Sequence, residues 1–174
     1  MLLLWQHLYY KGQLEELENA DNTKIILVSK QDMQLRLYDF KGNLLFSAPV
    51  AVGRNSGNKG KIGDMRTPEG VFQVEDIERS DDWKHDFGDG KGSIQGAYGP
   101  YFIRLSVPGH KGIGIHGTHE PESMGTRVSE GCIRMRNEDI EQLVSLISLP
   151  LTVIVTPGAD DEKTNELDNK NNKK

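Results

Sequence analysis

One stretch of the sequence concentrates the residue types that perform covalent chemistry. Residues 109–137 contain the single cysteine, Cys132, and three of the five histidines. A cysteine attacks as its thiolate, but a free thiol, with a pKa of about 8.5, is mostly protonated at neutral pH. We expect His116 to accept that proton, because it ends a predicted strand from which its side chain can project. Amides near Gly131 and the cation of Arg134 could then stabilise an oxyanion.

Less reactive interpretations of these residues stay open from the residues alone. A lone cysteine is most often a small buried hydrophobic residue, and an isolated histidine is most often structural. Zinc is a third interpretation, since His110, His116, His119 and Cys132 are four plausible ligands. They lack the closely paired spacing that is typical of zinc sites, so we expect no metal.

Three further patterns match nucleotide- or metal-binding motifs in spelling only. Residues 112–117 read G-x-G-x-x-G, but they lie within a predicted strand and do not open a helix. The glycine-rich stretch 53–60 fails the phosphate-loop test, because Lys61 is followed by isoleucine. The aspartates of residues 81–89 depart from EF-hand spacing, and we interpret them as a solvated loop.

The composition of the whole chain sets the class of protein. The chain has 174 residues, which suffices for one domain of ordinary size. Hydrophobic residues make up 36% and charged residues 27%, a balance typical of soluble globular proteins. The formal charge of −5 gives no electrostatic footprint for nucleic acid, so we expect no nucleic-acid partner. A single cysteine also excludes an internal disulfide.

The elements that must position these residues are mostly strands. Apolar and β-branched runs predict strands at 25–29, 44–52, 71–74, 101–107, 113–116 and 151–155. Leu35 and Leu37 belong to a further strand, which a turn at 39–43 connects into a hairpin. One helix is predicted near 137–147, where Ile140, Leu143 and Val144 share an apolar face. The fold class is therefore mostly β, a sandwich or open barrel with one main helix after Cys132.

The sequence divides into three segments. Residues 1–23 predict an N-terminal helix or connector, with the remnant of an export signal or anchor as the alternative. Residues 24–157 contain the folded domain. Residues 158–174 are polar and almost without apolar side chains, so we expect a disordered tail. Within the domain, residues 80–99 predict a long loop that could cover the site as a lid.

A longer set of motifs resembles one known family, the catalytic domain of L,D-transpeptidases, which are cell-wall enzymes of the YkuD type. The motifs are Ile115-His116-Gly117-Thr118, Met124-Gly125 and Val128-Ser129-Glu130-Gly131-Cys132-Ile133-Arg134-Met135, preceded by Val52-Gly53 and Thr67-Pro68-Glu69-Gly70. The resemblance spans about residues 24–157. Many members carry histidine where this chain has Glu130, a flanking position that we expect to affect substrate preference more than activity.

The resemblance implies roles for individual residues. Cys132 would be the nucleophile and His116 the general base, and the carbonyl of Gly117 would orient the imidazole. The remaining positions would form the oxyanion hole or contact the substrate, with amides of Gly131 and Cys132 in that hole: Gly131, Arg134, Ser129, Thr118, Met124 and Gly125. The implied fold is a β-sandwich-like domain.

The implied reaction starts on a peptidoglycan stem tetrapeptide. A thioester forms, D-Ala leaves, and the amine of a second stem completes a cross-link, without a metal or organic cofactor. Water in place of the amine would make the protein an L,D-carboxypeptidase, and a non-catalytic peptidoglycan-binding module is the alternative of another class. We expect a monomer in the bacterial envelope or periplasm, although residues 1–23 do not meet the criteria of an export signal.

Overall fold

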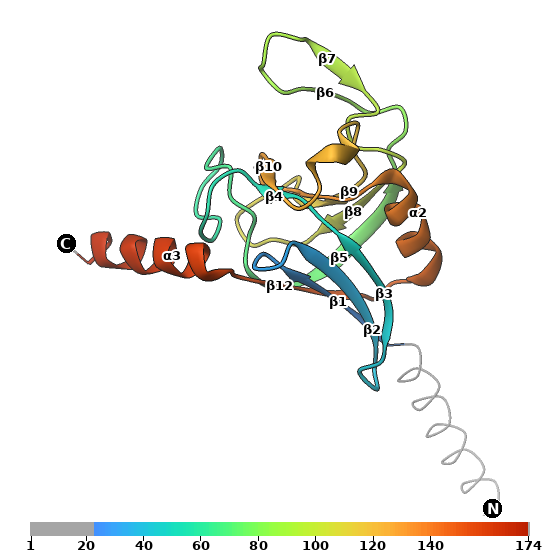
Figure 1. The fold of residues 1–174 in the computed structure, drawn as a ribbon, viewed down its shortest axis with the longest axis horizontal. Coiled ribbons are helices and arrows are strands. Elements are labelled where there is room, and N and C mark those ends of the chain that lie inside the picture. The colour runs from blue at the N-terminus through green and yellow to red at the C-terminus, as the bar shows by residue number, and fades with distance from the viewer. Residues whose placement is uncertain (1–22, 174) are drawn as a thin grey trace, which may run out of the picture.

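The computed structural model describes residues 23–173, so the prediction for the N-terminal segment falls largely outside the described residues. Its centre is an 8-stranded mixed sheet with the strand order β11-β9-β8-β5-β12-β1-β2-β3 (Figure 1). The strands in chain order are β1 (Lys24–Ser29), β2 (Gln34–Asp39), β3 (Leu44–Pro49), β5 (Gly70–Arg79), β8 (Tyr101–Leu105), β9 (Gly114–His116), β11 (Ile133–Arg134) and β12 (Thr152–Thr156).

Smaller elements surround this sheet. Two short ladders are formed by β4 (Val52–Gly53) with β10 (Arg127–Ser129) and by β6 (Lys84–Asp86) with β7 (Ser93–Gln95). The helices are α2 (Asn137–Leu146), α3 (Ala159–Asn171) and the 3-10 turn η1 (Pro121–Ser123). Within residues 23–173, no helix has the length and apolar character needed to cross a membrane.

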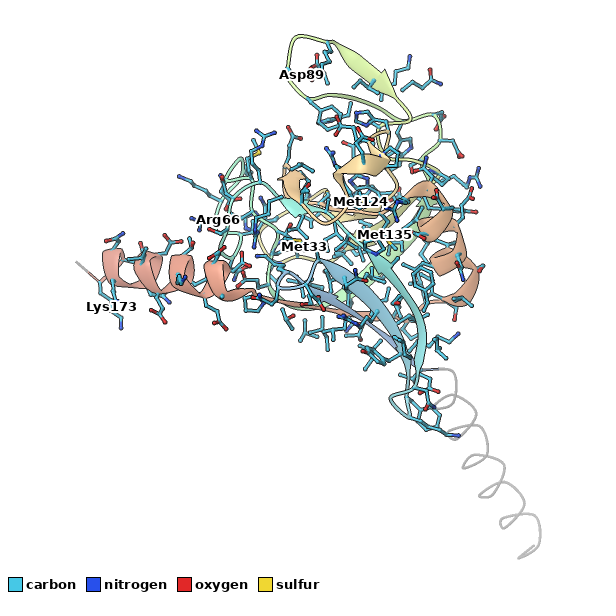
Figure 2. The ribbon with its side chains drawn as sticks, viewed as in Figure 1. Met33, Arg66, Asp89, Met124, Met135 and Lys173 are labelled. Carbon is cyan, nitrogen blue, oxygen red and sulfur yellow. The ribbon has the colours of Figure 1, made fainter. Side chains whose placement is uncertain are left out.

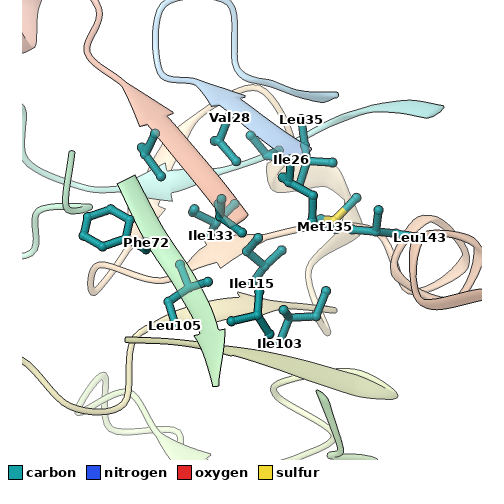
Figure 3. Packing of buried hydrophobic residues seen from close by; sticks show 14 of the residues in the cluster. Ile26, Val28, Leu35, Phe72, Ile103, Leu105, Ile115, Ile133, Met135 and Leu143 are labelled. Atoms are coloured by element: carbon teal, nitrogen blue, oxygen red, sulfur yellow. The ribbon is translucent and has the colours of Figure 1, made fainter. Parts of the chain in front are cut away.

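The core is one cluster of buried hydrophobic residues that come mainly from the large sheet. Alternating residues of β1 and β12, such as Ile26 with Val153 and Val28 with Val155, pair in parallel and are almost fully buried. Ile115 and Ile133 from the other end of the sheet join the same cluster, and Leu143 of α2 packs against it (Figure 3). The period-2 burial explains why the strands were predictable from the sequence. The mostly-β fold with a main helix after Cys132 is thus confirmed.

Two local predictions are wrong. Residues 158–174 are not a disordered tail throughout, because Ala159–Asn171 form helix α3. Its first turn is acidic, which suits a helix N-terminus, and the side chain of Asp161 is completely buried. Residues 80–99 are not an irregular loop, because β6 and β7 pair in an antiparallel hairpin. Figure 2 labels Asp89 near the tip of this hairpin, which projects away from the sheet.

Candidate active site

Two short parallel strands at one edge of the large sheet position the predicted nucleophile and base. β9 ends at His116, and β11 begins directly after Cys132. Their register pairs Ile133 with Ile115 and Arg134 with His116. Because both isoleucines are fully buried, the ladder is anchored in the core and holds the two chemical segments side by side.

Cys132, His116 and Arg134 line one pocket of about 220 Å³. The Cys132 side chain is a half-buried free thiol, whereas only 3% of His116 is exposed. Ser129, also predicted for the site, borders the same pocket. The other residues that line it are His85, Phe87, Tyr98, Gly112, Ile113 and Glu130.

The imidazole of His116 is held on several sides. Its Nδ1 donates to the carbonyl of Gly117 at 2.5 Å, which is the contact expected from the sequence. This bond places the proton of a neutral ring on Nδ1 and leaves Nε2 as an acceptor. The ring stacks on Phe102 with centroids 5.6 Å apart and meets the edge of Tyr98 at 4.9 Å. His116 is therefore oriented before any substrate binds.

The electrostatics of the pair favour two neutral groups. Burial lowers the pKa of His116 to about 3, against the hydrogen bond to Gly117, and the positive charge of Arg134 lowers it further. Burial also raises the pKa of the Cys132 thiol, which a hydrogen bond from Gly114 and the charge of Arg134 only partly offset. At neutral pH the resting pair is thus a thiol and a neutral imidazole, not a thiolate and an imidazolium.

The loop before Cys132 is tightly fixed. Gly131 has a φ of 137°, and a Cβ there would lie 2.9 Å from the carbonyl oxygen of Arg66. Ser129 Oγ accepts the N–H of Gly131 at 3.1 Å and donates to the carbonyl of Cys132 at 2.5 Å. The Gly131 amide, expected to serve an oxyanion, is therefore engaged inside the loop. Thr67 Oγ1 donates to the Gly131 carbonyl at 2.9 Å and so fixes the backbone directly before Cys132.

Several predicted substrate-contacting residues do not line the pocket. The backbone N–H of the buried Thr118 donates to the side-chain oxygen of Asn137 at 2.8 Å, which connects the end of β9 to α2. Met124 follows the turn η1, and Gly125 donates its N–H to the carbonyl of Val50 at 2.9 Å. These three residues support the segment between β9 and β10, and the substrate contacts expected of them stay a prediction.

Sequence reasoning missed His85 and Tyr98 as parts of the site. The Nε2 of His85 lies 2.9 Å from the carboxylate of Glu130, and its Nδ1 lies 3.0 Å from the hydroxyl of Tyr98. Phe87 also reaches the pocket, with the guanidinium of Arg134 5.2 Å from its ring centroid. The only sequence signal was the unusual length of residues 80–99, which marks a region but not individual residues.

The zinc interpretation finds no matching cluster. Within residues 23–173, no group of three or more His, Cys, Asp or Glu side chains is arranged to hold a metal ion. His119 instead packs its ring against Phe87, with centroids 5.3 Å apart. His110 borders a separate pocket of about 290 Å³ that includes Lys59 and Glu69.

Comparisons with known proteins identify similar sequences. A family model described as the L,D-transpeptidase catalytic domain matches residues 23–155. The chain is 33% identical over 132 residues to the putative L,D-transpeptidase YkuD of Bacillus licheniformis, covering 76% of this chain and 65% of that protein. It is 36% identical over 109 residues to the putative L,D-transpeptidase YqjB of Bacillus subtilis, covering 62% and 59%. The matched region is less than two thirds of the length of either relative.

Solved structures share the fold. The catalytic domain of the Enterococcus faecium (E. faecium) L,D-transpeptidase superposes with a TM-score of 0.57 at 20% identity, covering 78% of this chain and 98% of that domain. The helical cell shape determining protein Pgp2 of Campylobacter jejuni gives a TM-score of 0.57 at 25% identity, covering 79% and 49%. The half-barrel sheet is thus a fold already seen in other proteins.

Proposed function

Since the chain belongs to the L,D-transpeptidase catalytic domain family, we propose that it is a cysteine-dependent L,D-transpeptidase acting on peptidoglycan stem tetrapeptides. The observation that carries the proposal is a single pocket lined by Cys132, His116 and Arg134. A binding module would have no need of a thiol beside an imidazole whose Nδ1 is fixed on a carbonyl and whose Nε2 is left as an acceptor.

The first half-reaction forms a thioester. Cys132 Sγ attacks the carbonyl of the diamino acid that precedes the terminal D-Ala, and His116 Nε2 takes the thiol proton. The carbon–nitrogen bond then breaks, and the imidazolium returns this proton to the nitrogen of the departing D-Ala. Because thiol and imidazole start neutral, the proton moves as the carbon–sulfur bond forms. General-base help of this kind contributes roughly 10²–10⁴ in rate.

The second half-reaction resolves the thioester. The amine of an acceptor stem attacks the acyl carbon, His116 takes a proton from the amine, and this proton goes to the departing sulfur. The product is a direct cross-link between two stems, and the thiol is regenerated. Water in the same role would give a tripeptide and make the protein a carboxypeptidase.

Arg134 is the cation assigned to the developing negative charge. Its side chain is 5% exposed and borders the pocket, and Glu120 Oε2 accepts from its Nη1 at 2.8 Å. A guanidinium has five N–H donors, so one bond to Glu120 fixes the group and leaves donors for a substrate oxygen. Ser129, Gly131, Thr118, Met124 and Gly125 hold the surrounding loops in this proposal.

The substrate sets the proposed place of action. Peptidoglycan lies outside the cytoplasmic membrane, so we place the enzyme in the bacterial envelope, with donor and acceptor stem peptides as its partners. The formal charge of −5 is compatible with a small peptide substrate and gives no electrostatic attraction for the phosphates of a nucleic acid.

Mass spectrometry of the protein incubated with a disaccharide-tetrapeptide tests the proposal. Cross-linked dimers formed by the intact chain, and absent with Cys132→Ala, are the expected result. Tripeptide monomers alone would replace the transpeptidase with a carboxypeptidase. Unchanged substrate, together with binding of muropeptide by a correctly folded protein, would favour the non-catalytic module.

A further inference from the structure

A buried ionic cluster lies behind the nucleophile loop, where α3 begins. Lys30 Nζ and Asp161 Oδ1 are 2.9 Å apart, and both side chains are completely inaccessible to solvent. Removing two charges from water is costly unless hydrogen bonds satisfy the remaining donors and acceptors. The arrangement around Asp161 meets this requirement.

The carboxylate of Asp161 accepts from four donors. Oδ1 accepts from the N–H of Gly57 at 2.7 Å and from Lys30, while Oδ2 accepts from Arg127 Nη2 at 2.7 Å and from the N–H of Gly158 at 2.9 Å. Burial alone would raise the pKa of this carboxyl, but these donors together hold it below its usual range. Asp161 is therefore a charged hub that joins four segments of the chain.

One route from this hub reaches the nucleophile loop through Lys30. The ammonium group also donates to the carbonyls of Gly57 at 3.0 Å and of Thr67 at 3.2 Å. Thr67 Oγ1 in turn donates to the carbonyl of Gly131, the residue before the nucleophile. Three consecutive polar contacts thus connect Asp161 to the backbone beside Cys132.

A second route runs through Arg127. This residue opens β10, which pairs with β4 and ends at Ser129. The hydroxyl of Ser129 donates to the carbonyl of Cys132 itself. The guanidinium of Arg127 therefore ties the strand that leads into the nucleophile loop to the same carboxylate.

We propose that Asp161 is a positioning residue for the nucleophile, acting through Lys30 with Thr67 and through Arg127 with β10. The inference rests on the proposed function for its consequence in catalysis, although the loop geometry does not depend on the substrate. Helix α3 then contributes to the active site indirectly, because it carries the carboxylate of Asp161, to which both Lys30 and Arg127 bind. Asp161 touches neither substrate nor reacting atoms.

The test compares Asp161→Asn with the matched control Asp160→Asn. Asp160 is the preceding residue of the same helix, its side chain is 80% exposed, and its carboxylate pairs with Lys163 at 3.8 Å. Misplacing a reacting group by about 1 Å can cost about 10² in rate. We expect Asp161→Asn to lower kcat about 10²-fold with KM within about threefold, and Asp160→Asn to leave both unchanged.

A substrate-independent readout accompanies the kinetics. Alkylation of Cys132 by iodoacetamide is followed from pH 6 to pH 10, at a temperature where circular dichroism shows each variant to be folded. If the pH dependence of the alkylation rate differs from that of the unmodified chain in Asp161→Asn but not in Asp160→Asn, the positioning role is supported. Because alkylation needs no peptidoglycan, this result is decided even if the proposed reaction fails.

A second pair of variants keeps the inference open to refutation if Asp161→Asn does not fold. Arg127→Gln cuts only the second route, at a residue whose side chain is 21% exposed, and Arg127→Lys restores the charge. We expect the glutamine variant to shift the alkylation profile and the lysine variant to recover it partly. Folded variants with wild-type alkylation and wild-type kcat would overturn the proposal.

Discussion

At the scale of single residues, burial decides the protonation of the site. His116 has 3% of its surface exposed, lies between two aromatic rings and stays neutral far below its ordinary pKa. Sequence spacing could propose this histidine as a base, but it could not reveal how deeply the ring is buried. The consequence is a pair that exchanges its proton only during the reaction, and this has measurable effects on stability and on rate.

The stability of the fold should depend on pH through His116. An imidazole in the unfolded chain takes up a proton below pH 6.5, whereas the buried ring stays neutral until about pH 3. Protons therefore favour the unfolded state, and stability is lost as pH falls through this window. We expect the native chain to lose about 2 kcal/mol more than His116→Gln between pH 7 and pH 5. Urea unfolding at the two pH values measures this difference, and equal losses would contradict the buried neutral ring.

The rate should show no inflection at the ordinary pKa of histidine. Since His116 is already a neutral base at pH 5, kcat/KM should stay nearly level between pH 5 and pH 7. A profile at several pH values with one donor substrate checks this expectation. A decline of roughly 25-fold from pH 7 to pH 5, with its midpoint near pH 6.5, would mean that the imidazole is accessible to protons in the free enzyme.

The backbone at Gly131 should tolerate no side chain. Its φ of 137° is strained for any other residue, and an added Cβ would press on the carbonyl of Arg66. Gly131→Ala should destabilise the fold by roughly 1–3 kcal/mol and displace the Cys132 loop. Gly109→Ala is the control, because its φ of 76° carries the strain while nothing lies within 4 Å of the added carbon. Thermal unfolding and Cys132 alkylation should both change more at Gly131.

At the scale of elements, the sequence predicted those with a regular apolar period. β1, β2 and β12 alternate buried and partly exposed residues, and α2 buries Ile140 and Leu143 on one face. Helix α3 escaped prediction because polar contacts hold it. Asp161 is its one buried residue, and Asp168 pairs with Arg66 at 2.6 Å. The hairpin of β6 and β7 escaped prediction because each strand has only three residues, of which only the middle one is partly buried.

The same limits apply to the site. Cys132, His116 and Arg134 were found because their types and order have a chemical meaning, and the pocket unites them. His85 and Tyr98 line the pocket because β6 pairs with β7, and no pattern in the local sequence predicts this pairing. Residues with a chemical signature were therefore predictable, and residues placed by long-range packing were not.

The hairpin of β6 and β7 should move as one unit that His85 fastens to the domain. His85 bridges Glu130 and Tyr98 with two hydrogen bonds of about the usual length. Losing bonds worth about 1 kcal/mol or more should speed amide exchange across residues 84–95 roughly tenfold in His85→Ala. Lys91→Ala is the control, since the exposed side chain of Lys91 pairs with Asp89 inside the hairpin and not with the rest of the domain. Equal exchange in both variants would mean that other contacts fasten the hairpin.

At the scale of the whole molecule, the first and last strands of the large sheet meet at its centre. β1 and β12 are neighbours in the order β5-β12-β1-β2, and their parallel register joins residues 25–29 to residues 152–156. Figure 1 shows the two strands side by side, with α3 leaving beyond β12. Closing the sheet therefore requires nearly the whole domain to be in place, whereas the far turns of α3 add little to the core.

This arrangement predicts two levels of stability in one molecule. Amides of β1 and β12 should exchange only through global unfolding, because Ile26, Val28 and Val153 are fully buried around them. Ile26→Ala should lower the free energy of unfolding by about 2–5 kcal/mol and lower the protection of both strands equally. Amides of residues 166–171 should exchange through local fraying, since Asp161 is the one buried residue of α3 and the Asp168–Arg66 ion pair is partly exposed. Native-state hydrogen exchange in dilute denaturant separates the two levels, and a common opening energy for β12 and residues 166–171 would contradict this hierarchy.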